Sequence, residues 1–194
     1  MGAQRDDAPY DVGVIHGRFQ VLHRDHLRYL LAGRALCRQL VVGVTNPDPT
    51  RSRDRGADPH RTAPQANPLT YYERQLMVRA ALEAAGVPTA AFAVVPLPID
   101  VPELYRYYVP LDAVFFLTIY DAWGRQKRSL FQGLGLRTHV LWEVAPEQKG
   151  LSASQVRERM IRGEPWEPLV PPPVADLMKE WDIPGRLRGL RGVR

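Results

Sequence analysis

The stretch DVGVIHGRFQVLHRDH, residues 11–26, decides the fold of this chain. Its first six residues form a short, nearly continuous apolar run, which is typical of a strand buried on both faces of a parallel sheet. Leu27, Leu30 and Leu31 then recur at the spacing of a helix. The stretch therefore predicts a strand that passes directly into a helix, with the polar residues between them at the carboxyl end of the strand.

Four further apolar runs follow along the chain, at residues 40–45, 91–97, 112–118 and 138–144. Helical patterns stand between them, so that strand and helix alternate five times. This alternation predicts an α/β fold, a doubly wound, five-stranded parallel sheet of the Rossmann-like type with right-handed crossovers. Ligands of such sheets bind at the carboxyl ends of the strands, which directs attention to the segment after residue 16.

Two of the predicted helices begin with capping boxes. A T-x-x-E box at 70–73 opens a helix that Gly86 ends, and an S-x-x-Q box at 152–155 opens one that Gly163 ends. Residues 46–68, by contrast, form a long segment without periodicity, and structureless loops longer than about 12–15 residues tend to be functional or disordered. The sequence leaves open whether this loop closes over substrates or is an insertion.

The length of 194 residues suits one domain, which we expect at residues 11–163. A Pro-bounded turn and one short helix predict a C-terminal helical extension at 164–185, followed by a basic tail at 186–194. That tail, RLRGLRGVR, holds four arginines and no acid, so the net charge of +5 falls to +1 without it. The positive charge therefore does not make nucleic acid an expected partner of the domain.

The composition predicts a soluble, cytoplasmic protein. No run approaches the roughly 18 consecutive apolar residues that a membrane span needs. The N-terminus MGAQRDDAPY lacks the basic-then-apolar order of a signal peptide. The single cysteine, Cys37, stands in an apolar helical pattern, which favours a buried, inert thiol and excludes a disulfide framework or a cysteine-based metal cluster.

The polar segment after the first apolar run has the residues of a phosphate site. It contains a glycine, an arginine and two histidines three residues apart, His23 and His26, at a predicted helix N-terminus. The free N–H groups and the positive end of the helix dipole favour anions there. Residues at i and i+3 share a helix face, so both imidazoles could reach one polyphosphate. The alternative is a surface pair of histidines beside a capping Asp25.

The segment HGRFQVLHRDH (16–26) resembles the GRFQPxHxGH signature of the nucleotidyltransferase superfamily with the HxGH motif, and within it the archaeal-type nicotinamide-mononucleotide adenylyltransferases. Residues 67–82 resemble the NPFT..ER helix of that family, and residues 94–100 are similar to its strand and following loop. Residues 151–174 resemble its ISGTxIR signature with the W..LVP continuation. With two separated motifs in the right order, the chain is identified as a member of the superfamily.

The resemblance implies attack by an acceptor phosphate on the α-phosphorus of a nucleoside triphosphate, with release of pyrophosphate. A phosphate monoester is already an anion at neutral pH, so alignment and charge neutralisation suffice, without an enzymic base or nucleophile. Mg²⁺ is expected to come with the triphosphate, and no protein ligand to a metal is predicted. The base is expected between Gly17 and the backbone after Ser152, a mode of recognition that does not separate ATP from CTP.

The motif positions carry over to this sequence as candidate site residues. The candidates for catalytic charge stabilisation around the triphosphate are Arg18, His23, His26 and Arg157. The candidates for nucleotide binding are His16, Gly17, Phe19, Gln20, Ser152 and Ser154. On spacing alone, Arg157 is also compatible with a solvated helix position.

The chain departs from the family pattern at several positions. Asp25 replaces the glycine of HxGH, which puts a carboxylate where the triphosphate approaches, and Val21 replaces the proline of GRFQP. Tyr105 stands where the archaeal enzymes carry a tryptophan that stacks on a pyridine ring. Their short TNNP turn is replaced by LTIYDAWGRQKRSLF, residues 117–131. Together these departures predict a rebuilt acceptor pocket.

The candidate acceptor-binding residues are aromatic or basic, namely Tyr105, Tyr120, Trp123 and Arg128. Trp123 would suit a flat ring by stacking. Basic side chains would suit a small, multiply charged acceptor, and those available are Arg106, Arg125, Lys127 and Arg128. Those between 125 and 128 equally fit the solvated face of a helix.

The leading hypothesis is a nucleotidyltransferase that moves a nucleoside monophosphate, from CTP rather than ATP, onto the phosphonate or phosphate of a small acceptor. Such an enzyme is similar to the cytidylyltransferases of phosphonate natural-product pathways. The alternative is the nicotinamide-mononucleotide adenylyltransferase reaction, which makes NAD from ATP. A nucleotide-sensing regulator, for which Asp25 is the sign, and an RNA-binding protein that uses residues 186–194 are further alternatives. The archaeal relatives form symmetric assemblies, which allows a homo-oligomer here.

Overall fold

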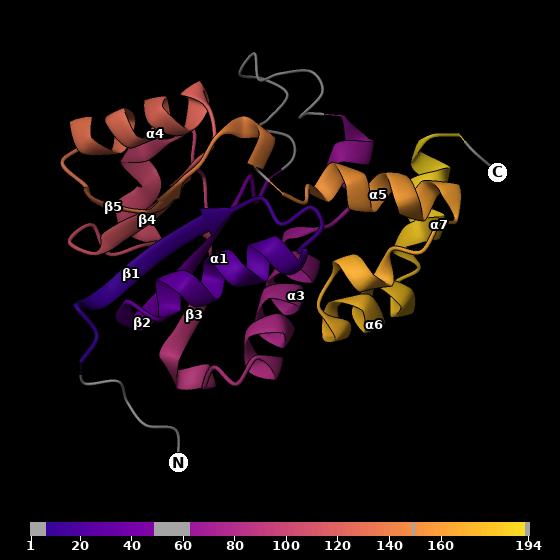
Figure 1. Ribbon diagram of the computed structural model, residues 1–194, viewed down its shortest axis with the longest axis horizontal. Helices are drawn as coiled ribbons and strands as arrows, with labels where there is room; N and C mark the ends of the chain where they lie inside the picture. Colours follow the sequence, from indigo (N-terminus) through magenta and orange to yellow (C-terminus); the bar gives the residue numbers. More distant parts are fainter. Residues whose placement is uncertain (1–6, 49–62, 149, 193–194) are drawn as a thin grey trace.

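Five parallel strands form the sheet of the computed structural model, which describes residues 7–48, 63–148 and 150–192. The strand order is β3-β2-β1-β4-β5, and every neighbouring pair is parallel. The strands are β1 (Tyr10–Gly17), β2 (Cys37–Thr45), β3 (Phe92–Leu97), β4 (Val114–Ile119) and β5 (Arg137–Glu143). The predicted doubly wound α/β fold is therefore confirmed, with the decisive first strand at the centre of the sheet (Figure 1).

Helices connect the strands and continue beyond the last of them. The α-helices are α1 (Arg24–Arg34), α3 (Tyr71–Ala84), α4 (Ala122–Gly133), α5 (Ala153–Arg162), α6 (Pro172–Glu180) and α7 (Ile183–Leu190). Short 3-10 helices lie at Pro64–Ala66, Thr89–Ala91, Pro102–Tyr107, Pro146–Gln148 and Glu167–Leu169. Most of the long loop expected at 46–68 lies outside the described residues, so its predicted role is not addressed by the structure.

Both predicted capping boxes are present. The Thr70 hydroxyl accepts the Glu73 N–H, and the Glu73 carboxylate accepts the Thr70 N–H at 2.8 Å, which starts α3. Ser152 and Gln155 make the same reciprocal pair at the start of α5. Gly163 ends α5 at φ +69°, a left-handed conformation that glycine adopts with little strain.

Each face of the sheet has its own apolar core. On one face, Ile15 and Phe116 pack with buried residues of α1, α3 and the C-terminal helices. On the other face, Val14 and Phe115 pack with Phe131 of α4. Because side chains alternate along a strand, neighbouring residues at the end of β1 face opposite sides of the sheet. This alternation divides the site residues of the first motif between two environments.

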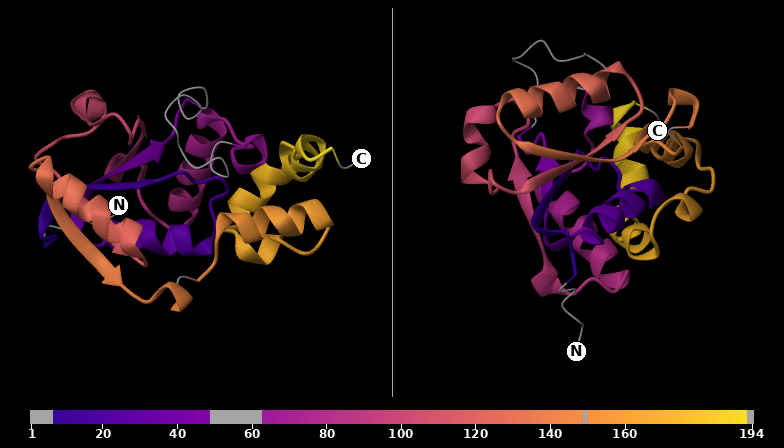
Figure 2. Two further views of the ribbon diagram at one scale, coloured as in Figure 1. Left: turned by 90° about the horizontal axis from the view of Figure 1, so that it is seen from above. Right: turned by 60° about the vertical axis from the view of Figure 1, so that its left-hand side comes forward.

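The C-terminal helices gather at one end of the molecule, far from β5 (Figures 1 and 2). Residues 186–190, which we expected in a basic tail, instead form the second half of α7. Ile183 and Leu187, four residues apart, are fully buried and hold this helix against the rest of the core. The tail prediction was wrong because the abundance of arginine obscured this apolar pair.

Cys37 is buried as predicted, but it is the first residue of β2 rather than part of a helix. Its thiol donates to the carbonyl of Gly33 at 3.3 Å. Burial raises the pKa of the Cys37 thiol to about 11, which keeps it protonated and inert at neutral pH. Among the described residues, none of the helices combines the length and the apolar character needed to cross a bilayer.

Candidate active site

The two histidines of the first motif start α1. His23 is the N-cap of the helix and His26 its third residue, and they form a capping box in which each Nδ1 accepts the other's backbone N–H at 3.4 Å. The two rings stack with their centroids 3.7 Å apart. Because each Nδ1 acts as an acceptor, the proton of each neutral ring sits on Nε2. The local backbone thus turns both imidazoles into Nε2–H donors at a helix N-terminus, where anions bind favourably.

Both rings are neutral at neutral pH in this structure. Burial lowers the pKa of His23 to about 4, although the nearby Asp25 carboxylate opposes the shift. Burial also lowers the pKa of His26 well below 6.5; the charges of His23 and Arg18 act in the same direction, and a hydrogen bond with the backbone of Val21 opposes the shift. Desolvation disfavours the charged form of an imidazole, while a bound polyanion would favour it. The pair is therefore set up to donate neutral hydrogen bonds, with protonation available once phosphate charge arrives.

Arg157 joins the second motif to the first. Its side chain is buried, donates one hydrogen bond to the carbonyl of Gln20 and another to the Ser154 hydroxyl at 3.1 Å. Burial, together with the charge of Arg18, lowers the pKa of Arg157 to about 10, so it remains a cation at neutral pH. The structure therefore places Arg157 against the first motif and excludes the solvated position that its spacing also allowed.

Four positively charged or protonatable groups converge at the carboxyl end of β1. They form what we call the cationic cluster: Arg18, Arg74, His26 and Arg157. Burial is the largest cause that lowers the pKa of Arg74 and of His26, and the charge of Arg18 adds to it in both. Cations brought this close repel one another, and a bound polyanion relieves that repulsion. The cationic cluster therefore concentrates positive charge at this end of the sheet.

Asp25 holds the two motifs together. Its Oδ2 accepts the backbone N–H of Leu151 at 2.7 Å, immediately before the N-cap of α5. The sequence suggested that Asp25 could cap α1, but His23 takes that role. Gly150 has φ +76°, and a Cβ there would lie 2.5 Å from Asp25 Oδ2. The carboxylate that replaces the motif glycine thus has a neighbour shaped to accommodate it.

We expect Asp25→Ala to lower the free energy of unfolding by about 2 kcal/mol, because it removes a charge-assisted hydrogen bond to a backbone N–H. Asp25→Asn keeps an acceptor oxygen for Leu151 and should lose less than half as much. Urea unfolding measures both. Turnover of Asp25→Gly, which restores the family motif, should fall with the lost contact; a rise from inactivity to turnover would instead support the regulator hypothesis.

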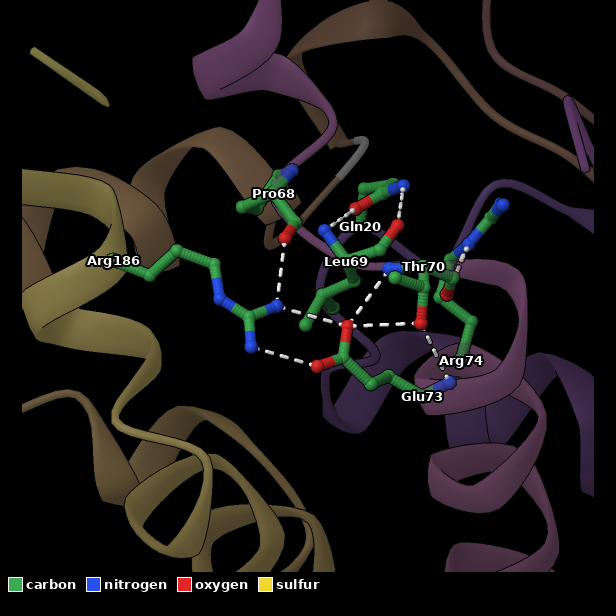
Figure 3. Close-up of polar contacts among 7 residues, drawn as sticks. All are labelled: Gln20, Pro68, Leu69, Thr70, Glu73, Arg74 and Arg186. Atoms are coloured by element: carbon green, nitrogen blue, oxygen red, sulfur yellow. Dashed lines mark hydrogen bonds and ion pairs between the residues drawn. The ribbon is translucent and has the colours of Figure 1, made fainter. Parts of the chain in front are cut away.

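Gln20 and Phe19, predicted to bind nucleotide, have their side chains turned into the protein. The Gln20 amide exchanges two hydrogen bonds of 2.9 Å with the backbone of Leu69, one in each direction (Figure 3). Phe19 is buried, and its ring packs edge-on against His26 at 5.2 Å between centroids. Both side chains therefore support the loop between β1 and α1, and the carbonyl of Gln20 is engaged by Arg157.

Arg74 is a residue beside the candidate site that the sequence analysis did not single out. Its guanidinium is 2% exposed and donates to four backbone carbonyls, those of Arg18, Thr45, Asn46 and Thr70, at 2.7–3.2 Å. It thereby ties the ends of β1 and β2 to the start of α3. The signal was present in the NPLTYYER segment, whose resemblance to the family helix included this arginine.

Arg186 completes the support from the C-terminal side. It donates to the carbonyl of Pro68 at 3.0 Å and pairs with both carboxylate oxygens of Glu73 at 2.8–2.9 Å (Figure 3). Burial alone would raise the pKa of Glu73, but the hydrogen bonds from Arg186 and Thr70 outweigh it and lower that pKa. Arg186, which the composition placed in a basic tail, thus holds the start of α3 in position through Pro68 and Glu73.

The predicted acceptor residues differ in burial and in their partners. Tyr105 is fully buried under α4, and its hydroxyl donates to the carbonyl of Ile99 at 2.6 Å, so its ring is not open for stacking. Tyr120 accepts the indole N–H of Trp142 at 2.8 Å. Trp123 is 54% exposed, and Arg128 is exposed further along α4.

Trp142 is a second residue near the candidate site that the sequence analysis did not single out. It lies near the end of β5, half-buried, with the guanidinium of Arg28 5.5 Å from its ring centroid and the ring of Tyr29 packed edge-on at 6.1 Å. The sequence showed this tryptophan only as part of an apolar strand. Its indole is a flat surface close to the start of α1, on the side away from Tyr105.

The basic residues of α4 divide between its two sides. Lys127 is half-buried, whereas Arg125 and Arg128 are exposed and Arg125 pairs with Glu143 at 3.4 Å. Of the three basic residues of α4 considered for the acceptor, Lys127 is therefore the one that is not exposed.

The described residues contain no group of three or more His, Cys, Asp and Glu side chains that could hold a metal ion.

Comparisons with known proteins identify the family of this chain and two of its relatives. The family model described as cytidylyltransferase-like matches residues 14–159. A protein of Streptomyces viridochromogenes named phosphonoformate cytidylyltransferase is 51% identical over 176 residues, which cover 91% of this chain and 95% of that protein. The nicotinamide-nucleotide adenylyltransferase of Pyrococcus horikoshii is 30% identical over 179 residues, 92% of this chain and 88% of that protein.

Solved structures agree with the architecture. A bifunctional NMN adenylyltransferase/ADP ribose pyrophosphatase of Francisella tularensis, solved with AMP and a manganese ion, superposes with a TM-score of 0.60 at 14% identity. The match covers 93% of this chain and 52% of that one, so this chain spans about half the length of the bifunctional protein. At this level of identity the likeness concerns the fold alone.

Proposed function

We propose, from the premise that this chain belongs to the cytidylyltransferase-like family, that it transfers the cytidylyl group of CTP to the phosphonate of a small acceptor and releases pyrophosphate. It is an enzyme of the nucleotidyltransferase class. The single observation that carries the choice of substrates is the 51% identity to the relative named phosphonoformate cytidylyltransferase, against 30% to the adenylyltransferase of Pyrococcus horikoshii.

The arrangement of the site supports this chemistry. A phosphonate oxygen attacks the α-phosphorus of CTP, a new P–O bond forms, and the bond to the β-phosphate oxygen breaks, so pyrophosphate leaves with the electron pair. The phosphonate is already an anion and needs no base. We expect the Nε2–H donors of His23 and His26, together with the guanidinium of Arg157, to stabilise the charge that accumulates on the leaving group.

Mg²⁺ enters this proposal as part of the nucleotide substrate. Triphosphate oxygens are the hard ligands that Mg²⁺ prefers, and the ion usually keeps several waters when it binds phosphates. The chain's own contribution is the cationic cluster, which neutralises the remaining phosphate charge. Asp25, the carboxylate within the first motif, already accepts a hydrogen bond from the N–H of Leu151.

The test is pyrophosphate release from each of the four nucleoside triphosphates, with phosphonoformate, methylphosphonate and nicotinamide mononucleotide as acceptors. We expect release only with CTP and a phosphonate, at a typical enzyme rate of about 1–10³ per second. Formation of NAD from ATP and nicotinamide mononucleotide at such a rate would overturn the proposal in favour of the adenylyltransferase.

A further inference from the structure

The side chain of His16 is buried without a hydrogen-bond partner. It is 7% exposed, and within the described ranges neither Nδ1 nor Nε2 has a partner. Leaving a buried polar group unsatisfied costs about 1–3 kcal/mol. His139, in the same sheet, shows the ordinary arrangement, with its Nδ1 at 2.9 Å from the Tyr10 hydroxyl. The ring of His16 therefore points to a ligand that it binds.

His16 faces the α4 side of β1. Val14, two residues earlier, belongs to the core on that face, and the ring of His16 lies 5.4 Å from the ring of Phe131. Phe19 and its neighbour His26 belong to the opposite face, with the core beneath α1. His16 thus stands at the carboxyl end of β1 on the side away from the cationic cluster, although the motif alone suggested that it binds nucleotide.

Lys127 brings positive charge to the same side. It stands four residues before Phe131 on α4, so the two side chains share the helix face that packs on the sheet. Burial is the largest cause that lowers the pKa of His16 well below 6.5, and the charge of Lys127 adds to it. At neutral pH His16 is therefore a neutral ring with one N–H donor, and Lys127 supplies the cation beside it.

We propose that His16 and Lys127 bind the oxygens of the anionic acceptor, with a ring N–H of His16 donating to a phosphonate or carboxylate oxygen. The inference rests on the proposed function, because it names the acceptor side of that same site. In phosphoryl and nucleotidyl transfer the attacking and leaving oxygens lie roughly in line on opposite sides of the phosphorus. The end of β1 separates His16 from the cationic cluster, as two such substrate sites require.

The experiment compares the wild-type enzyme with His16→Phe, which keeps the aromatic packing against Phe131 and removes both ring nitrogens. His139→Phe is the matched control, the same substitution at a sheet histidine whose ring already has a partner. Calorimetry would measure the binding of phosphonoformate in the presence of a non-hydrolysable CTP analogue, and separately the binding of that analogue alone.

We expect His16→Phe to weaken phosphonoformate binding by about tenfold to a hundredfold, the range for one hydrogen bond to a charged group. Binding of the CTP analogue should change by less than about twofold, and Tm should not fall, because an unsatisfied polar group has been removed. His139→Phe should bind phosphonoformate as the wild type does. Should His16→Phe fold poorly, His16→Leu removes the same nitrogens with a smaller side chain.

Equal binding of phosphonoformate by the wild type and His16→Phe would overturn the inference, as would a parallel loss of the CTP analogue, which would make His16 a nucleotide residue. A wild type that binds no phosphonoformate overturns it as well. A different result would contradict the proposed function, namely that the wild type releases no pyrophosphate from CTP with any phosphonate. The two failures can therefore be distinguished.

Discussion

Replacing His26 or His23 by alanine should lower kcat by about 10²- to 10³-fold, the usual cost of removing one positioned donor from a developing anion. Each imidazole carries its proton on Nε2 at the start of α1, because each Nδ1 accepts a backbone N–H. The measurement is steady-state pyrophosphate release, with CTP affinity measured separately so that kcat and KM effects are resolved.

The control for this prediction is His23→Asn. Asparagine is a good N-cap, so its side-chain oxygen can accept the His26 N–H and keep α1 intact, while the Nε2–H donor is gone. We expect the asparagine variant to retain the stability of the wild type and to lose nearly as much turnover as His23→Ala. Recovery of most of the activity in His23→Asn would show that His23 acts through the helix cap alone.

The same reasoning extends to Arg18 and Arg157. We expect substitution of either by alanine to lower turnover by tenfold or more. Arg157→Ala should also cost stability, because it leaves the Gln20 carbonyl and the Ser154 hydroxyl without their donor. Unchanged turnover in Arg18→Ala, Arg157→Ala and both histidine variants would contradict the assignment of the site.

Arg74→Ala should produce the largest loss of stability in the chain, about 4 kcal/mol in the free energy of unfolding. One buried guanidinium satisfies four carbonyls from three segments, and its removal leaves each of them buried or poorly hydrated. Arg74→Lys keeps the charge but replaces the planar fork with a single ammonium, so it should recover only part of the loss. Urea denaturation of the nucleotide-free enzyme measures the free energy of unfolding of the wild type, Arg74→Ala and Arg74→Lys.

Arg79 supplies the matched control on the same helix. Its guanidinium is about half exposed and pairs with Glu83, one turn later, at 3.5 Å. Exposed pairs of this spacing contribute about 0.3–0.5 kcal/mol, so Arg79→Ala should be nearly neutral. A cost for Arg74→Ala no greater than that for Arg79→Ala would show that the four carbonyls find water instead.

Much of the site was predictable because its backbone is organised by local signals. The placement of His23 and His26 at a helix start follows from an apolar run, a polar break and a helical period, all within 21 residues from Asp11 to Leu31. The box at Ser152 and Gln155 is similarly short-range. The comparisons confirm the superfamily that these motifs indicated and favour the cytidylyl over the adenylyl reaction.

The errors concern side chains whose partners are far away in sequence. Tyr105 stands in the sequence where the archaeal enzymes carry a stacking tryptophan, yet its side chain is buried in the core beneath α4. Arg186 counted as tail charge, yet it pairs with Glu73, 113 positions earlier. Composition and periodicity carry no information on such pairs, because they depend on how helices pack against the sheet.

The sequence by itself determined the parallel sheet, the helix starts and the position of the two histidines at the start of α1, because periodicity, caps and strand ends are set by residues within a few positions of one another. Only the tertiary structure decided the rest. Asp25 meets Leu151 across 126 positions, Arg74 meets the carbonyls of two strands, and His16 faces α4 without a partner. The physical reason is that a side chain's direction and partner are fixed by packing, which brings distant segments within hydrogen-bond distance only in the folded chain.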